Sequence, residues 1–501
     1  MAKHEKIRKS DSLNKTEKAS KENWLFISIL LVYSLLHWWP TRNLPYHWDS
    51  AGFVINTVVN FIDTNFTQLV GHQLGYAHPM LIPLTVALTW KIFGHTLLVS
   101  HLVMLPFLPM LLISTYYIGK KISNSYTGFL SALLVGVTPV VFVEYGLIYL
   151  DLPMSAFATL AVALWLYNKK IWSMIALSLS IWAKLPGILI LPSIFIYNWV
   201  KEKEKRNPTK WNWNNYLPLI IPVIAFLAWI TYHYWVTGWA LIKPEVMDNL
   251  PKSNNSIQKI VHALNITFLD QTRGFMSLVL IASSLFLKSK NRLNQIITPI
   301  SITLLSLLII STIFFSKMLE YGARYSIFLI PPLAVLSVFS LLKASNNKKI
   351  VTITVAAILF YSVITMWNPK TPTQNWEFSP KKDLSYIDLI KIGQQAATYL
   401  SQNYPNAKIY GYFPENYQIT QPYQGYIDQA LDFTVCTEFK YIPDQTQIMY
   451  LHAYTPYQQV CKQIIEKIPS RRLKRFESNG KWLELHLFDS TASATLIPPS
   501  Q

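Results

Sequence analysis

The chain has 501 residues, of which 51% are hydrophobic and only 14% are charged. The apolar residues come in long blocks separated by short basic stretches, a pattern typical of a polytopic membrane protein. In a soluble chain the net charge of +18 would indicate a nucleic-acid partner. Here much of the excess lies in a few short loops, so membrane topology explains it and no nucleic-acid partner is expected.

The first residues differ in composition from the rest of the chain. Residues 1–23 are rich in Lys and poor in apolar side chains, which predicts a disordered basic tail on the cytoplasmic side. The apolar run Trp24–Pro40 comes next, and no small-residue cleavage site follows it. We therefore expect this run to be kept as the first transmembrane helix rather than removed as a signal peptide.

Span length and the distribution of Lys and Arg together predict the topology. A span needs about 20 mainly apolar residues, and cytoplasmic loops carry an excess of positive charge. These rules predict a polytopic α-helical membrane domain over residues 24–367 with about eleven spans, the N-terminus inside and the C-terminus outside. The strongest cytoplasmic marker is the run Lys201–Arg206. The predicted spans are residues 24–40, 97–119, 128–145, 152–167, 171–183, 187–200, 216–235, 275–287, 296–315, 325–342 and 350–367.

Two long loops are predicted on the outer side, residues 41–96 and 237–273. Within the first, Met80–Phe93 is apolar but short, and Pro83 interrupts it, so we expect a helix that lies at the interface instead of spanning. If this segment were a true span, every later segment would be inverted. The basic run Lys201–Arg206 would then lie outside, against the charge rule.

Beyond residue 367 the composition changes to that of a soluble protein. Residues 368–501 are long enough for a small domain and open with a linker rich in Pro and Thr. No catalytic motif is found there, so its expected work is to cover the outer face of the membrane domain or to bind an acceptor. The apolar patterns predict a mixed α/β extracytoplasmic domain with helices over residues 384–400 and 457–468, strands over residues 408–413 and 447–454, and a hairpin of residues 472–476 and 481–488 about Ser478-Asn479-Gly480.

The two cysteines, Cys436 and Cys461, both lie in this predicted domain. An extracytoplasmic location permits a disulfide between them. The sequence is equally compatible with two free buried thiols.

The predicted topology gathers ionisable groups of the membrane domain on its outer side. Such groups are costly at the membrane boundary, which favours a functional role for them. The first is Asp49, the only acid in the loop Tyr46–Gly52. The others are His72 and His78 in the same outer loop, Glu144 and Asp151 in the next outer turn, Lys184, and Arg324 beside Tyr325.

Several of these residues also have a structural interpretation. Asp49 and Asp151 can each serve as a helix N-cap, because a carboxylate satisfies the free N–H groups of a first helical turn. Lys184 and Arg324 can extend along apolar surface toward water. Both cations, however, fall on the side where the topology disfavours positive charge, which favours a functional role.

The order of several short motifs carries a resemblance. The early Asp of the first outer loop is followed by Tyr76-Ala77-His78-Pro79, which leads a short apolar helix ending in Lys91-Ile92-Phe93-Gly94. An Asp-Leu-Pro in the second outer turn, an Ala-Lys-Leu-Pro-Gly turn and an Ala-Arg-Tyr entry to a Pro-Pro helix complete the series. In this order and on this side, the motifs resemble the GT-C glycosyltransferases, in the branch of the protein O-mannosyltransferases and the bacterial aminoarabinose transferase of lipid A.

The resemblance implies a GT-C-like fold and an activity. Enzymes of these families transfer a sugar from a polyprenyl phosphate carrier to an acceptor outside the cytoplasm. The implied partners are a polyprenyl phosphate-sugar donor, an extracytoplasmic acceptor and the lipid bilayer, and the lack of retention motifs favours a prokaryotic plasma (inner) membrane. The runner-up function is a transporter or flippase of lipid-linked sugars, and a third is a non-catalytic partner in envelope assembly.

Residue by residue, the resemblance implies that Asp49 is the catalytic base, although Ser50 stands where several relatives have a second acid. Asp151 matches the second-loop acid of those enzymes and is the second candidate catalytic residue. His78 matches a position before proline near the carrier phosphate, and Lys184 and Arg324 match further cationic positions. These three are the implied phosphate-binding residues, and Glu144 and Tyr325 beside them are further candidates for binding the substrate.

These residue types suit an inverting transfer. A carboxylate within reach of the acceptor hydroxyl can take its proton, and fixed cations stabilise the charge that develops on the departing phosphate. The activated bond is already in the donor, so no nucleotide or other cofactor is expected. A divalent metal stays open, because the possible ligands are of types that Mg, Mn or Zn accept but their spacing is not diagnostic. They are Asp49, His72, His78 and Asp151.

Overall fold

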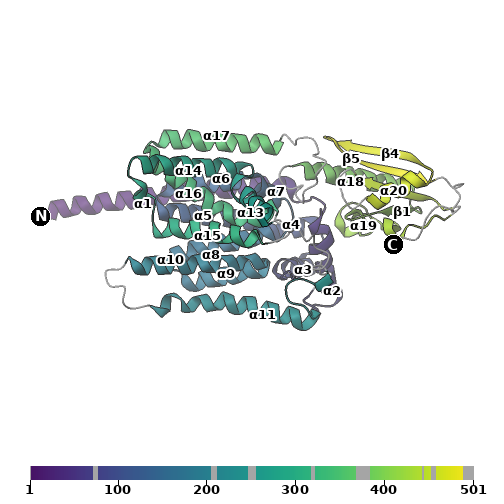
Figure 1. Ribbon diagram of the computed structural model, residues 1–501, viewed down its shortest axis with the longest axis horizontal. Coiled ribbons are helices and arrows are strands. Elements are labelled where there is room, and N and C mark those ends of the chain that lie inside the picture. Colours follow the sequence, from purple (N-terminus) through teal and green to yellow (C-terminus); the bar gives the residue numbers. More distant parts are fainter. Residues whose placement is uncertain are drawn as a thin grey trace.

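The computed structural model of the chain places a smaller mixed domain at one end of a long helical bundle (Figure 1). Structure is described for residues 2–70, 77–204, 212–245, 256–317, 322–367, 384–442, 445–452 and 459–488, with side chains from Lys21 onward. Most helices of the bundle run along one long axis. The N-terminus and the mixed domain lie at opposite ends of that axis.

The bundle is built from helices and short helical turns. The elements of its first half are α1 (Ala2–Thr41), η1 (Ser50–Ile55), α2 (Asn56–Asp63), α3 (Leu81–Phe93), α4 (Leu97–Met104), α5 (Phe107–Ile122), α6 (Ser125–Gly136), α7 (Pro139–Tyr145), α8 (Asp151–Leu166), α9 (Lys170–Ala183), η2 (Leu185–Leu189) and α10 (Ile190–Lys203). Those of its second half are η3 (Trp213–Asn215), η4 (Leu217–Leu219), α11 (Ile220–Thr237), α13 (Ser256–Leu264), η5 (Asn265–Leu269), α14 (Thr272–Ser289), η6 (Leu293–Gln295), α15 (Pro299–Phe315), η7 (Ala323–Leu329), α16 (Ile330–Ser345) and α17 (Lys348–Trp367).

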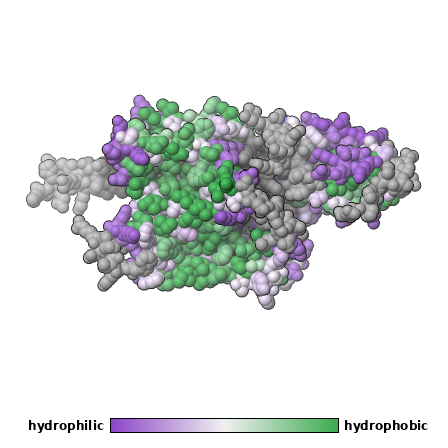
Figure 2. Space-filling model, viewed as in Figure 1, coloured by the Kyte–Doolittle hydropathy of each residue, from purple (hydrophilic) through white to green (hydrophobic). Residues whose placement is uncertain are grey.

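The surface of the bundle is that of an integral membrane protein. Figure 2 shows a broad apolar band over the helices, with hydrophilic residues at the end that carries the N-terminus and on the mixed domain. Large apolar side chains of these helices, such as Leu227 of α11 and Ile353 of α17, are exposed, as expected of side chains that face lipid. Within the described part of the chain, five helices are long and apolar enough to cross a membrane: Lys21–Thr41, Leu97–Ile122, Trp213–Thr237, Ala323–Ser345 and Lys348–Trp367.

Each predicted span coincides with helix, but several are broken. The predicted span 128–145 is two helices, α6 and α7, bent by 68° against each other. The break lies before Pro139, which has no backbone N–H and disfavours helical geometry in the preceding Thr138. The count of about eleven spans stays a prediction, as does the placement of α3 at the interface.

The N-terminal residues differ from the prediction of a disordered tail. Helix α1 begins at Ala2, so its backbone continues the first span as helix. The physical reason is that Ala, Lys and Glu are good helix formers. Adding them to a helix that already exists also avoids the cost of nucleation.

The mixed domain confirms the elements predicted for it and adds to them. Its sheet has the order β2-β1-β3-β5-β4, in which β1 is parallel to β2 and β3, and β5 is antiparallel to β3 and β4. The three-residue strand β2 and the single-turn helix α19 were not expected. The elements are α18 (Ser385–Asn403), β1 (Lys408–Gly411), α19 (Glu415–Gln418), η9 (Pro422–Gln424), β2 (Phe433–Val435), η10 (Cys436–Glu438), β3 (Gln447–His452), α20 (Gln459–Lys467), β4 (Ser470–Ser478) and β5 (Lys481–Phe488).

The mixed domain packs directly on the bundle. Val143, Leu147 and Tyr149, from α7 and the turn after it, belong to the same buried apolar cluster as Tyr386 and Leu389 of α18. A Cβ atom placed on Gly146 would lie 2.4 Å from the hydroxyl oxygen of Tyr386. The domain therefore covers the end of the bundle at which Asp49 lies.

Cys436 and Cys461 form a disulfide, which decides between the two states that the sequence left open. The bond joins η10 to α20 across a sequence separation of 25 residues. Both residues are buried in a small apolar cluster with Phe439 and Met449. The crosslink thus ties α20 to the turn that follows the edge strand β2.

Replacing both cysteines by serine should destabilise the mixed domain. A crosslink that closes a loop of this length contributes about 3 kcal/mol to the free energy of unfolding. We expect a lower thermal midpoint for Cys436→Ser/Cys461→Ser in the detergent-solubilised full chain. The wild-type protein treated with a thiol reductant is the matched control and should melt like the double variant. Two titratable free thiols in unreduced, denatured wild-type protein would contradict the disulfide.

Candidate active site

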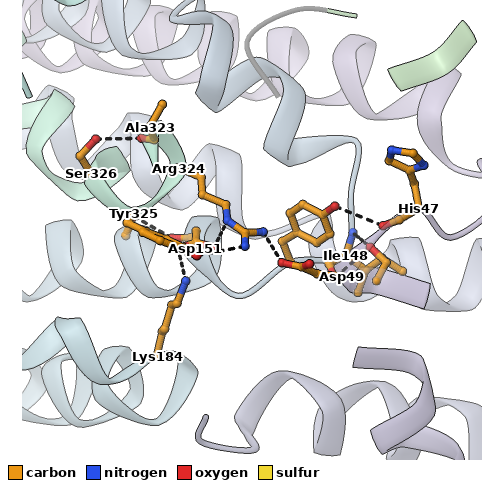
Figure 3. A network of polar contacts seen from close by, with 12 residues as sticks. His47, Asp49, Ile148, Asp151, Lys184, Ala323, Arg324, Tyr325 and Ser326 are labelled. Atoms are coloured by element: carbon orange, nitrogen blue, oxygen red, sulfur yellow. Dashed lines mark hydrogen bonds and ion pairs between the residues drawn. The ribbon is translucent and has the colours of Figure 1, made fainter. Parts of the chain in front are cut away.

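Asp49 lies in the turn between α1 and η1 and points into the bundle (Figure 3). It occupies the N-cap position of η1, but its side chain makes no cap hydrogen bond. Its carboxylate forms an ion pair with the guanidinium of Arg324 instead. The side chain is 28% exposed. The N-cap interpretation of this carboxylate is therefore wrong.

Asp151 is the first residue of α8 and is almost completely buried. Its Oδ1 atom lies 2.6 Å from Nζ of Lys184, and the exposed fraction of its side chain is 2%. Leu150 takes the N-cap position, without a side-chain cap. The positive end of the α8 dipole stabilises the negative charge of this carboxylate. Its side-chain partners are nevertheless the cations Lys184 and Arg324.

Lys184 follows the last residue of α9 and has an extended backbone conformation, two residues before Pro186. Its Nζ atom lies 4.0 Å from the centre of the Tyr325 ring, in addition to its ion pair with Asp151. A buried ammonium group is stable only when it is paired. The snorkelling interpretation is wrong for this residue, because its side chain is 9% exposed.

Arg324 joins the two acids. Besides its ion pair with Asp49, its Nε atom lies 3.8 Å from Oδ2 of Asp151. Its Nη2 atom lies 3.3 Å from the hydroxyl oxygen of Tyr325, and its guanidinium carbon lies 5.2 Å from the centre of the Tyr149 ring. Figure 3 shows these side chains converging from separate elements. The result is a compact cluster with two negative and two positive charges.

Glu144 is fully buried near the end of α7, seven residues before Asp151. Its effect is visible at Tyr149, whose pKa is raised well above its usual value by burial, then by the negative charges of Asp49 and Glu144. Glu144 therefore lies within electrostatic reach of the cluster, on the side of the mixed domain.

His78 lies beside the same cluster, with its ring 5.2 Å from that of Phe53. Burial lowers the pKa of His78 to about 3, and the positive charge of Lys184 acts in the same direction. The imidazole is consequently neutral near pH 7 and offers a hydrogen bond rather than a positive charge. His72 lies outside the described residues.

Three residues hold the cluster in place and were not found from the sequence. The hydroxyl of Tyr149 donates to the carbonyl oxygen of His47 at 3.1 Å, which fixes the turn before Asp49. The hydroxyl of Ser50 accepts from the backbone N–H of Ile148 at 3.2 Å, which ties that turn to the segment between α7 and α8. A paired-carboxylate site would need an acid at position 50, and the serine has this structural contact instead.

The third is Arg273, at the start of α14. Its buried guanidinium donates to the carbonyl oxygen of Ala323 at 2.9 Å and to the hydroxyl of Ser326. These bonds hold the segment that carries Arg324. A single Arg at the end of a predicted loop carries no sequence signal for such a contact.

Neither a protein-family model nor a curated protein matches the sequence. Solved structures do match. ArnT from Cupriavidus metallidurans in the apo state superposes with a TM-score of 0.56 at 10% sequence identity, covering 94% of this chain and 98% of that chain. The chain has the fold of ArnT. The resemblance to the GT-C glycosyltransferases is therefore confirmed at the level of the fold.

Two further solved structures are similar. ArnT from Cupriavidus metallidurans bound to undecaprenyl phosphate has a TM-score of 0.55 at 10% identity, with 92% of this chain and 97% of that chain covered. An oligosaccharyltransferase from Archaeoglobus fulgidus, tethered with an acceptor peptide, has a TM-score of 0.46 at 10% identity over 95% of this chain and 74% of that chain. The similarity to both ArnT structures extends over more than nine-tenths of this chain, so it includes the bundle and most of the mixed domain.

The candidate metal ligands can be compared with the geometry. Over the residues that the structure describes, no three or more His, Cys, Asp or Glu side chains are grouped so that they could hold a metal ion. Asp49 and Asp151 are bound to Arg324 and Lys184 instead. Of the candidate metal ligands Asp49, His72, His78 and Asp151, the three that the structure describes therefore do not form a metal site. His72 lies outside the described residues.

The first prediction of the site concerns the buried pair of Asp151 and Lys184. The variant Asp151→Asn leaves Lys184 without its closest negative partner, which should cost about 3–5 kcal/mol. The double variant Asp151→Asn/Lys184→Gln leaves no unpaired charge and should recover most of that loss. Thermal midpoints of the wild type, both single variants and the double variant measure the coupling. Additive losses in the double variant would contradict the ion pair.

The second prediction concerns the protonation of His78. An unfolded His binds a proton below pH 6.5, whereas the folded residue stays neutral down to about pH 3. Acidification from pH 6.5 to 4 therefore costs the wild type stability at this residue, and His78→Gln avoids that cost. We expect the thermal midpoint of the variant, measured relative to that of the wild type at the same pH, to rise as the pH falls. A difference that does not change with pH would show that His78 is not held neutral.

Proposed function

We propose that the chain is an inverting glycosyltransferase that moves a hexosyl or pentosyl group from a polyprenyl phosphate carrier to a lipid, glycan or protein acceptor. The observation that carries this proposal is the cluster in which Arg324 bridges Asp49 and Asp151 beside Lys184. It combines a carboxylate for the attacking hydroxyl with cations for the departing phosphate. The ArnT-like fold supports it, because ArnT has been solved bound to undecaprenyl phosphate.

In the proposed reaction Asp49 is the general base. The acceptor hydroxyl oxygen attacks the anomeric carbon of the sugar while its proton passes to the Asp49 carboxylate. The bond between the anomeric carbon and the phosphate oxygen breaks on the opposite face, and polyprenyl phosphate leaves with the electron pair. Configuration at the anomeric carbon is inverted. A positioned base of this kind is worth about 10²–10⁴ in rate.

Arg324 has two alternative partners in this scheme. Without a donor its guanidinium is held by Asp49 and Asp151. The phosphate of a bound donor competes for the same guanidinium, because Arg matches phosphate geometry in a bidentate way. When Arg324 turns to the phosphate, the Asp49 carboxylate is released to accept a proton. Donor binding thereby activates the base.

The other residues of the site support the phosphate and the cations. Lys184 adds a second positive charge to the phosphate site while Asp151 holds it in place. His78, neutral near pH 7, donates a hydrogen bond to a phosphate oxygen. Tyr325 packs under Lys184 and beside Arg324. Glu144 faces the sugar from the side of the mixed domain.

The proposed arrangement in the membrane follows the charge rule. Residues 1–23 lie in the cytoplasm, residues 24–367 form the transmembrane catalytic domain with about eleven spans, and residues 368–501 lie outside. The site then faces the extracytoplasmic side of a prokaryotic plasma (inner) membrane. The Lys-rich end of α10 lies at the end of the bundle away from the mixed domain, which agrees with this orientation.

The function is tested with purified protein in lipid and radiolabelled polyprenyl phosphate sugars. Wild-type protein should move label from the carrier to acceptor present in an envelope extract, and Asp49→Asn should be at least about 10²-fold slower while remaining folded. Asp63→Asn is the matched control, because Asp63 is an acid at the end of α2 in the same outer loop. Near wild-type turnover by Asp49→Asn would exclude Asp49 as the base.

The same preparation tests the transporter. If the label never leaves the carrier but crosses the bilayer of proteoliposomes, the chain is a transporter or flippase of lipid-linked sugars. Label that stays with the lipid and on its original side excludes both functions and leaves a non-catalytic role in the envelope.

Removal of divalent metal is a separate test of the mechanism. Every proposed step uses side chains of the chain itself, so transfer should keep its rate after treatment with a chelator. Loss of transfer, restored by adding back Mg, Mn or Zn, would show that a metal takes part.

A further inference from the structure

The loop that carries Asp49 is held from the opposite side by the mixed domain. Both backbone groups of Tyr46 are bound across the domain boundary: its N–H donates to the carbonyl oxygen of Gln424 at 3.2 Å, and its carbonyl accepts from the hydroxyl of Tyr426 at 3.2 Å. Gln424 also donates through Nε2 to the carbonyl oxygen of Ala51 at 3.3 Å. These contacts lie just before and just after Asp49 in the sequence.

The same loop contains a residue in a disfavoured backbone conformation. Trp48, directly before Asp49, has a φ of +53°, a left-handed conformation that is disfavoured for a bulky residue. Its ring packs edge-on against that of Phe413, with the ring centres 5.0 Å apart. Such strain persists only where the surroundings impose it, and here Phe413 of the mixed domain supplies the contact.

Phe413 also meets the loop on the far side of Asp49. A Cβ atom placed on Gly52 would lie 2.4 Å from Cε2 of Phe413, so the backbone and the ring are in direct contact. The glycine is therefore required by the close approach of the mixed domain. Contacts at positions 46, 48, 51 and 52 thus enclose the base on both sides.

The cations of the site are held differently. Lys184 follows α9, and Arg324 lies in η7, whose position depends on Arg273 of α14. All of these elements belong to the bundle. The bundle also contacts the Asp49 loop, through Tyr149 and Ile148. The mixed domain thus contributes to the position of the base, whereas the described contacts of the two cations come from the bundle.

We propose that Phe413, Gln424 and Tyr426 are positioning residues that hold Asp49 in its catalytic place, so that the mixed domain completes the active site. The proposal rests on the proposed function of Asp49 as base. A misplacement of about 1 Å at a reacting group costs about 10²-fold in rate. Loss of these contacts should therefore lower kcat without raising the KM for the donor, because the cations stay in place and a displaced Asp49 competes less for Arg324.

The test compares Phe413→Ala with Phe439→Ala in the full chain. Phe439 is a buried core residue of the mixed domain, in a cluster whose described members all belong to that domain, so its truncation weakens the domain without touching the loop. We expect Phe413→Ala to lower kcat about 10- to 100-fold, with a KM for the donor no higher than about twice that of wild type. An equal loss of kcat in Phe439→Ala would overturn the proposal.

A change of size at the contact provides a second measure. Gly52→Ala places a methyl group against the Phe413 ring and should lower kcat. The double variant Gly52→Ala/Phe413→Leu removes the ring from that space, so its kcat should equal or exceed that of Gly52→Ala alone. If the loss of kcat in the double variant equals the product of the losses in Gly52→Ala and Phe413→Leu, the two residues act independently. That result would overturn the role of the Gly52–Phe413 contact in positioning Asp49.

Hydrogen exchange followed by mass spectrometry separates this proposal from the proposed function. Peptides that cover residues 46–55 should exchange faster in Phe413→Ala than in wild type and Phe439→Ala. Unchanged exchange in Phe413→Ala, or faster exchange with unchanged kcat, overturns the positioning role. If wild-type protein transfers no sugar, the proposed function fails and the role at Asp49 with it, but the loop would still exchange faster in Phe413→Ala.

Discussion

Arg324 and Lys184 are cations at a site that is largely closed to water, and each must be paired with a carboxylate to remain there. Asp49 and Asp151 supply those charges, so the turn before η1, the start of α8, the residue after α9 and η7 must meet at one point. Removing any one of the four side chains leaves the cluster with one unbalanced charge. The positions of the surrounding elements are therefore tied to this small group of ion pairs.

In the proposed mechanism the same ion pairs stabilise the site before the donor binds. Two neighbouring cations repel each other unless carboxylates neutralise their charge, and the proposed base is one of these carboxylates. Asp49 is the more exposed of the two acids, whereas Asp151 is almost fully buried. In the proposed mechanism Asp151 can therefore remain with Lys184 while Asp49 changes its partner.

The fold and the candidate site were predictable to different degrees. Long apolar runs allow few alternatives to helix in a membrane, so each predicted span coincides with helix. The Asn-Gly turn likewise predicted the hairpin of β4 and β5. The strand β2 was not predictable, because it has three residues and is defined by its pairing with β1. The segment with the bend before Pro139 was predicted as an unbroken span, since neighbouring helices often compensate for a proline.

The sequence by itself determined the class of protein, the family resemblance and the list of charges expected to share one side of the membrane, because hydropathy and the cost of burying charge act locally along the chain. It did not determine which charges are partners. An Asp has the same appearance in a sequence whether it caps a helix or pairs with a cation, and so does a Lys that snorkels or is buried in an ion pair. Only the tertiary structure brought Asp49, Asp151, Lys184 and Arg324 into contact. The disulfide and the contact of Phe413 with Gly52 were likewise decided by tertiary structure, because both depend on distances between segments far apart in the sequence.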